Sequence, residues 1–109
     1  MSDDQLTFTA RPVWADDTIG VRFWEFHQAH PEVEAALIRL ARQWQQARPG
    51  STCGMKMLWE RLRWEHAVGN LTGADFKLNN TFTAMYARWL SERPEFGDLF
   101  NLRARRCDR

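Results

Sequence analysis

The chain has 109 residues, a length typical of a single domain with one hydrophobic core. Hydrophobic residues make up 44% of it, which excludes a disordered chain, and the charged residues, 27%, are scattered rather than blocked. No apolar run approaches the roughly 20 residues that cross a bilayer, and the first residues lack the apolar core of a secretion signal. We therefore expect a cytoplasmic protein that contacts no membrane.

The charge is close to balanced but unevenly distributed. Fifteen Lys and Arg against fourteen Asp and Glu give a formal net charge of +1, well below the excess typical of a protein that coats nucleic acid. We expect an acidic N-terminal arm at residues 1–17, a helical domain at residues 18–102 and an arginine-rich tail at residues 103–109. Because the chain carries no secretion signal, Cys53 and Cys107 are expected to be two thiols rather than a disulfide.

The arm precedes the first predicted helix. Leu6 and Phe8 alternate with polar neighbours, as in a short strand, before Pro12 breaks the pattern. Helical spacing then begins, and it predicts a helix over residues 17–29 with one side formed by Phe23, Phe26 and His27.

The second helix has the clearest start and stop signals. Pro31 suits the first helical position, and Pro49 with Gly50 ends the run after Arg48. Apolar residues recur every three or four positions between them, at Val33, Leu37, Leu40, Ala41, Trp44 and Ala47. We expect a helix over residues 31–48 with one solvated face.

A third helix is predicted over residues 54–68, capped by Ser51 or Thr52 and ended by Gly69. Met57 and Trp64 lie on the side opposite its main apolar stripe, which consists of Met55, Leu58, Trp59, Leu62 and His66. Two arrangements fit this pattern. The helix is either central, with neighbours on both sides, as a chain with six Trp favours, or it packs on one side and presents its other side to a partner.

Residues 69–80 form the longest irregular stretch after the arm, and we expect Phe76 and Leu78 to hold it against the core as a turn or a short wing. A fourth helix is predicted from a cap at Asn79 or Asn80 to about Arg93. Its inward positions are Phe82, Met85, Tyr86, Trp89 and Leu90, and its outward positions are Ala84, Ala87 and Ser91.

Pro94 begins a last short helix with an apolar side of Phe96, Leu99 and Phe100. Together these elements predict an all-α fold, a compact bundle of four to five helices. The helices over residues 31–48 and 54–68 have the order of a helix-turn-helix pair, with a turn longer than usual and residues 69–80 in the place of a wing. A minimal two-strand pairing between residues 6–8 and 76–78 also fits.

Catalytic chemistry has no support in the sequence. There is no nucleophile elbow and no phosphate-binding loop, and the glycine-flanked residues 50–54 are typical of a helix cap. His27 and His30 stand three residues apart on a helix, as metal ligands can, but no His or Cys pair has the spacing of a zinc motif. We expect a protein that is not an enzyme and holds no metal or other cofactor.

Nucleic-acid binding, with DNA expected before RNA, is the leading functional prediction. Cations and amides that suit phosphates and base edges follow the third helix, the wing and the fourth helix: Lys56, Arg61, Arg63, Lys77, Asn79, Asn80 and Arg88. A structural interpretation competes with this one. Arg61 with Glu65 and Arg88 with Glu92 have the spacing of surface ion pairs, and the two asparagines are first of all cap residues.

The alternative is a protein-interaction module or an inhibitor of a host protein, including a homodimer. It would present Met57 and Trp64 together with the small outer residues of the fourth helix. Trp and Arg are the residue types that most often anchor such surfaces.

Short motifs between residues 26 and 103 also form a distinctive combination. They are Phe-His-x-Ala-x-Pro at residues 26–31, Glu-Arg-Leu-Arg-Trp-Glu at 60–65, Asp-Phe-Lys-Leu-Asn-Asn-x-Phe at 75–82, Tyr-Ala-Arg at 86–88 and Arg-Pro-Glu-Phe-x-x-Leu-Phe at 93–100. In this combination they resemble a family of short, mostly uncharacterised proteins encoded by bacteriophages and prophages. The resemblance implies a product of a phage or mobile element that acts in the cytoplasm of a bacterial host, where typical roles are regulating DNA or engaging a host protein.

Overall fold

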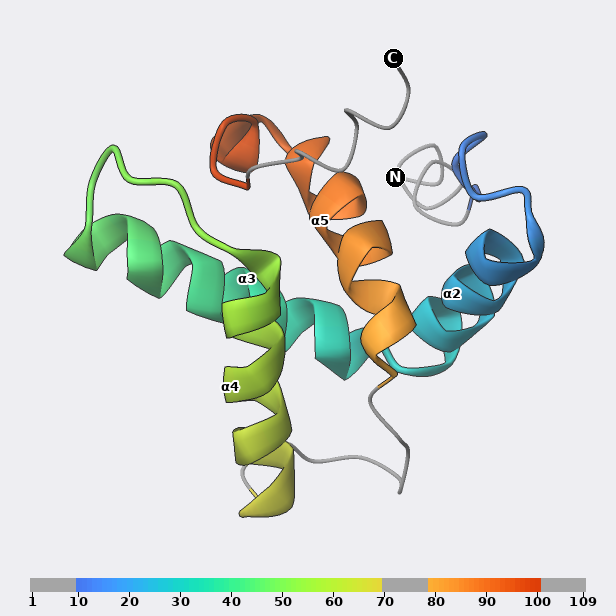
Figure 1. Ribbon diagram of the computed structural model, residues 1–109, viewed down its shortest axis with the longest axis horizontal. Helices are drawn as coiled ribbons and strands as arrows, with labels where there is room; N and C mark the ends of the chain where they lie inside the picture. The colour runs from blue at the N-terminus through green and yellow to red at the C-terminus, as the bar shows by residue number, and fades with distance from the viewer. Residues whose placement is uncertain (1–9, 70–78, 101–109) are drawn as a thin grey trace, which may run out of the picture.

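The computed structural model describes residues 10–69 and 79–100, whose regular structure is helical apart from one isolated β-bridge (Figure 1). In chain order the elements are α2 (Thr18–Ala29), α3 (Pro31–Ala47), α4 (Met55–Ala67), the 3₁₀ helix η1 (Asn80–Phe82), α5 (Thr83–Ser91) and the 3₁₀ helix η2 (Pro94–Phe96). The predicted all-α bundle is confirmed. No helix among the described residues is long and apolar enough to span a membrane.

Helix α2 begins where the sequence predicts. The Asp17 side chain accepts a hydrogen bond of 2.7 Å from the backbone N–H of Gly20, which satisfies one of the free donors at the helix start. Gly20 is required here, because a Cβ at this position would lie 2.6 Å from the Cα of Ala15. The cap therefore fixes how the preceding segment enters the bundle.

Helix α3 follows α2 after the single residue His30, and Pro31 occupies its first turn as predicted. Glu32 and Glu34 lie in the same turn, where the helix dipole favours negative charge. The helix ends at Ala47 with Arg48 as its C-cap, and Gly50, with φ of +82°, then takes the left-handed conformation in the turn that follows.

The predicted cap of the third helix is wrong. Helix α4 starts at Met55 with Gly54 as its N-cap, and no side chain caps it. The reason is a long-range contact: the N–H of Cys53 donates to the carbonyl of Leu99 at 2.8 Å, in a parallel bridge to Phe100. This pairing holds the chain extended through Cys53, so helical geometry begins two residues after it. Gly69, with φ of +87°, follows the end of α4 as predicted.

Asn79 is the predicted cap before α5. Its side-chain Oδ1 accepts from the N–H of Thr81 at 3.0 Å, and the chain passes through η1 before α5 proper begins. The helix ends at Ser91, two residues earlier than predicted. Ala87 was predicted to face outward but is 7% exposed, because both α4 and η2 pack against α5 and cover more than one of its sides.

The last predicted helix is a single 3₁₀ turn, η2, and its apolar residues are buried as predicted: Phe96, Leu99 and Phe100. The core is aromatic at its centre, where the ring centroids of Phe23 and Tyr86 lie 4.8 Å apart in an edge-to-face contact. The largest fully buried side chains come from every major helix, with Phe23 on α2, Leu37 on α3, Trp59 on α4 and Tyr86 on α5. One core thus serves all the described helices.

Helices α3 and α4, the predicted helix-turn-helix pair, pack together and cross steeply in Figure 1. Residues 48–54 connect them, a longer link than the three or four residues of the usual motif. The predicted wing residues Phe76 and Leu78, the strand pairing between residues 6–8 and 76–78, and the arginine-rich tail lie outside the described residues.

Candidate functional site

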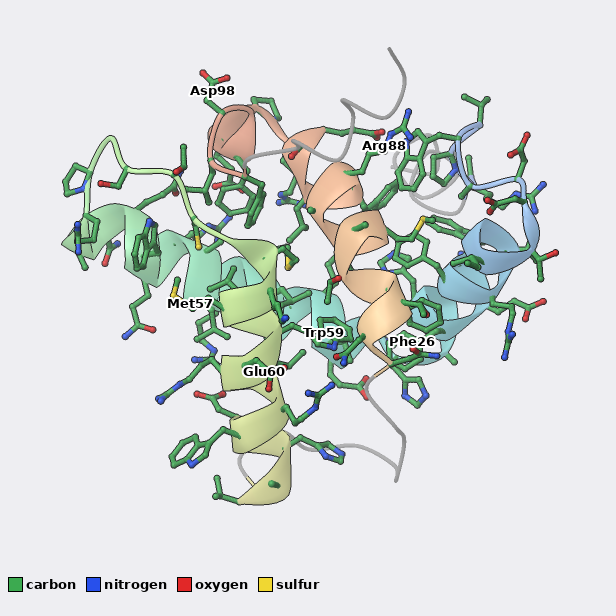
Figure 2. The ribbon with its side chains drawn as sticks, in the orientation of Figure 1. Phe26, Met57, Trp59, Glu60, Arg88 and Asp98 are labelled. Carbon is green, nitrogen blue, oxygen red and sulfur yellow. The ribbon has the colours of Figure 1, made fainter. Side chains whose placement is uncertain are left out.

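Helix α4 packs on one side only. Its inner side carries buried residues, Met55, Leu58, Trp59 and Leu62, with exposed fractions of 6% or less. Met57 and Trp64 are 45% and 51% exposed, and Figure 2 shows Met57 and Trp59 on opposite sides of the helix. Of the two arrangements that the sequence allowed, the central, fully covered helix is wrong, and the helix with one exposed apolar side is the one observed.

We call the exposed side of α4 the outer face, and it consists of Met57, Arg61, Trp64 and Val68. These residues are spaced four, three and four positions apart, so they form one stripe along the helix. Val68, the C-cap residue, is 51% exposed. Three of the five exposed large hydrophobic residues in the described part of the chain therefore lie on this one stripe.

Arg61 holds the centre of the outer face. Its guanidinium carbon lies 4.7 Å from the centroid of the Trp64 ring, a cation–π distance, and its Nε lies 3.5 Å from Glu65 Oε2. The predicted Arg61–Glu65 pair is therefore confirmed.

Glu65 makes a second, stronger ion pair that the sequence did not reveal. Arg39 of α3 donates to Glu65 Oε1 at 2.7 Å, and the Glu65 side chain is only 8% exposed. Two arginines thus share one buried carboxylate, which neutralises it and ties the outer face of α4 to α3. No sequence pattern connects residues 39 and 65; only the packing of α3 on α4 brings them together.

Two of the predicted nucleic-acid residues meet at the other edge of α4. Arg63 donates to Asn80 Oδ1 at 2.6 Å and to Glu60 Oε2 at 2.9 Å. Asn79, next in the predicted set, uses its side chain to cap η1. Lys56 is exposed on α4. The side-chain amides of Asn79 and Asn80 therefore act locally, the first as a cap and the second as a partner for Arg63.

The remaining predicted cation of the described residues lies elsewhere. Arg88 projects from α5 on the side away from α4, as Figure 2 shows, and its guanidinium carbon lies 4.9 Å from the Trp14 ring. The predicted Arg88–Glu92 pair is wrong. Trp14 contacts both residues instead: its Nε1 donates to Glu92 Oε2 at 2.6 Å, and its ring makes the cation–π contact with Arg88. Lys77 lies outside the described residues. The described members of the predicted nucleic-acid set are therefore divided between two regions of the surface.

A partly buried polar cluster lies at the edge of the core, between α2, α3 and α5. Trp89 Nε1 donates to Glu34 Oε2 at 2.8 Å, and His27 Nε2 lies 3.9 Å from Glu34 Oε1. Burial raises the pKa of the Tyr86 phenol far above its ordinary value, and burial also lowers the pKa of His27, an effect that Glu34 opposes. Three buried atoms in this region have no hydrogen-bond partner: His27 Nδ1, Trp59 Nε1 and Tyr86 Oη.

An open hollow of about 260 Å³ lies between the end of α3 and η2, with Gln45, Ser51, Glu95 and Asp98 among its lining residues. Among the lining residues, Glu95 accepts hydrogen bonds from Arg42 and Arg93. The bond from Arg42 is the main reason why the pKa of Glu95 is lowered. Within residues 10–69 and 79–100, no group of three or more His, Cys, Asp or Glu side chains could hold a metal ion.

Comparison with known proteins identifies no counterpart. No protein-family profile matches the chain, and no curated protein and no solved structure shows significant similarity to it. The resemblance to phage and prophage proteins therefore stays a prediction, and the function has to be inferred from the site itself.

Proposed function

We propose that this chain is a small non-enzymatic protein-interaction module and that the outer face of α4 is its binding surface. The observation that carries the proposal is the exposure of Met57, Trp64 and Val68 along a single stripe, at 45%, 51% and 51%. Large apolar side chains elsewhere in the described residues are fully buried, among them Phe23, Trp59 and Phe96. An apolar stripe that stays in water beside a well-filled core is typical of a surface that another protein covers.

The residue types on this face are those that dominate binding energy. Trp and Arg are enriched among the few interface residues that carry most of the affinity. Arg61 is held in place by Glu65 and by the Trp64 ring. A side chain that is already ordered loses less conformational entropy on binding, so this arrangement favours association.

The resemblance to phage and prophage proteins is compatible with this proposal but does not select it. The roles that the resemblance implies are regulating DNA and engaging a host protein in the cytoplasm of a bacterial host, so it fits both candidate functions. Under this proposal the chain contributes binding rather than chemistry, as an accessory or an inhibitor.

Nucleic-acid binding is the second candidate, and one contact favours it. The 2.6 Å hydrogen bond between Arg63 and Asn80 brings two predicted contact residues together, and the exposed Lys56 lies about two helical turns from Arg63 on α4. Against it, Arg61 and Arg63 each pair with a carboxylate, and Arg88 lies beyond α5. This candidate would be favoured over the first if the chain bound DNA or RNA with an affinity that falls steeply with added salt, and if the variant Lys56→Ala/Arg63→Ala no longer bound.

The proposal is tested with the purified full chain in nuclease-treated bacterial extract, using wild type, Trp64→Glu and Ile19→Glu. Ile19 is a matched control, because it is 43% exposed and lies on α2, away from the outer face. We expect wild type and Ile19→Glu to form complexes with protein, whether another protein or the chain itself, and Trp64→Glu to form none. Circular dichroism should show all three folded. Complexes that persist in Trp64→Glu, or the absence of any complex with wild type, would contradict the proposal.

A further inference from the structure

We propose that α2 and α5 form a binding site for the indole of a tryptophan-bearing peptide, and that the chain's own Trp14 occupies this site until such a peptide displaces it. The site lies on other helices than the outer face of α4, so it goes beyond the proposed function and its test does not depend on that function. The structure shows the class of ligand directly, because an indole is already seated there.

Three contacts of different kinds hold the Trp14 indole. Its Nε1 donates to Glu92 Oε2 at 2.6 Å, and the guanidinium carbon of Arg88 lies 4.9 Å from the ring. The Phe23 ring stacks with it at a centroid distance of 6.1 Å and an interplanar angle of 26°. Among the large apolar side chains, only tryptophan combines a wide aromatic face with a ring N–H donor. The acceptor and the cation therefore select tryptophan over phenylalanine.

The polar residues of this site belong to the surface of α5 rather than to the core. Arg88 and Glu92 are both exposed and stand four positions apart, a spacing at which such residues ordinarily pair. In the structure both contact Trp14 instead, and Figure 2 shows Arg88 projecting from α5 toward the segment that precedes α2. When the indole leaves, the two side chains can pair with each other or be hydrated, so the empty site leaves no buried charge.

Residues 10–14 are lightly attached to the rest of the described chain. Val13 is 88% exposed. Within the described residues, the backbone of this segment makes a single hydrogen bond, from the N–H of Ala15 to the carbonyl of Pro12 at 3.0 Å. Ala15 itself is fully buried and lies against the backbone of Gly20 at the start of α2. The segment can therefore open at residue 15 while α2 stays in place, and it loses little beyond the contacts of the indole.

The ligand that fits the opened site is a peptide that presents a tryptophan in a short turn, as residues 12–15 do. The tethered Trp14 competes with it at an effective concentration in the millimolar range. A free peptide therefore binds wild type weakly, and a strong partner needs contacts beyond the indole. The Trp14 contact is thus autoinhibitory, because it closes the site to weaker ligands.

Peptide binding by the full chain carrying Trp14→Ala tests the site. The probe is a fluorescein-labelled peptide with the sequence of residues 11–17, followed by fluorescence anisotropy. We expect Trp14→Ala to bind it about tenfold more tightly than wild type, or better, since no tethered indole competes. The matched control is Trp64→Ala, which also removes an indole that contacts an arginine but keeps Trp14, and it should bind no better than wild type. Equal binding by Trp14→Ala and wild type, or no binding by either, would overturn the proposal.

Two further changes test the contacts that select the indole. A peptide with alanine in place of its tryptophan should not bind Trp14→Ala. The double variant Trp14→Ala/Glu92→Ala should bind the original peptide about fivefold more weakly than Trp14→Ala, because it lacks the acceptor for the indole N–H. Binding that survives the loss of the peptide's tryptophan, or that Glu92→Ala leaves unchanged, would contradict the assignment.

Fluorine NMR of wild type labelled with 5-fluorotryptophan tests the proposal even if Trp14→Ala fails to fold. The Trp14 signal is assigned with Trp14→Phe. A large excess of the unlabelled peptide should move this signal toward its position in the urea-unfolded chain, while the signal of buried Trp59 stays in place. A Trp14 signal that excess peptide leaves unchanged would show that the indole is not displaced and would overturn the proposal.

Discussion

Arg61 and Trp64 form a cation–π pair on the exposed side of α4, with 4.7 Å between the guanidinium carbon and the ring centroid. They lie three positions apart on the helix, so the pair is local, but it continues inward to Glu65 and across to Arg39 of α3. The exposed indole is therefore part of an ordered surface rather than a side chain left free in water. This order is the structural basis for treating the outer face as a binding surface.

Two tryptophans on opposite sides of α4 should respond very differently to truncation. Trp59 is fully buried, so Trp59→Ala should lower the free energy of unfolding by about 3–5 kcal/mol. Trp64→Ala removes a half-exposed ring and its contact with Arg61, and should cost about 1 kcal/mol or less. Urea denaturation followed by circular dichroism measures both. Equal losses would show that Trp64 belongs to the core.

The carboxylate that Arg39 and Arg61 share should make their contributions non-additive. Both arginine side chains are 55% exposed, so removing either one alone should cost only about 0.5–1 kcal/mol, since the other still pairs with Glu65. The double variant Arg39→Ala/Arg61→Ala leaves a buried charge without either partner and should cost about 3 kcal/mol. Urea denaturation of wild type, the two single variants and the double variant gives the free energies of unfolding that this double-mutant cycle needs. Simple additivity would mean that Glu65 is hydrated when its partners are removed.

Tyr86 should be replaceable by Phe with a gain in stability. Its hydroxyl is buried and has no hydrogen-bond partner in the structure, so Tyr86→Phe should raise the free energy of unfolding by about 1 kcal/mol. Because burial raises the pKa of Tyr86 in the folded chain, its contribution is complete below the ordinary tyrosine value of about 10 and declines as pH rises above it. The variant should therefore lose less stability than wild type between pH 9 and pH 11, values chosen to bracket about 10. A substitution that destabilises the chain at neutral pH would indicate that the hydroxyl has a bound partner.

His27 should make the fold sensitive to mild acid. Burial lowers its pKa below the ordinary histidine value of about 6.5, so the neutral ring stabilises the fold above that pH, and the stabilisation is lost as pH falls through the lowered pKa. His27→Phe keeps an aromatic ring stacked on Phe23 but cannot titrate. Free energies of unfolding at about pH 7.5 and pH 5, on either side of the ordinary histidine value, should differ less in the variant than in wild type. An identical pH dependence in both proteins would assign the acid sensitivity to other groups.

Local signals in the sequence predicted the helices well. Pro31, Asn79 and Gly69 each act within a few residues of their own position, and each marks a helix end in the structure. The expected cap at Ser51 or Thr52 failed because Cys53 bonds to Leu99, a contact that no local pattern contains.

The candidate site was predictable only in part. Helical spacing placed Met57 and Trp64 opposite the core stripe, but whether a neighbour covers them depends on how many helices pack around α4. Likewise, the spacing of Arg88 and Glu92 suggested a pair that Trp14, which lies 78 residues before Glu92, replaces. Long-range packing, rather than local chemistry, decided these outcomes.

The most direct measurement of the central claim is fluorine NMR of the chain labelled with 5-fluorotryptophan, with the Trp64 signal assigned by the variant Trp64→Phe. If the outer face of α4 binds protein, the Trp64 signal moves as protein concentration rises or as extract proteins are added, while the signal of buried Trp59 stays in place. A Trp64 signal that is unchanged under all these conditions would contradict the account.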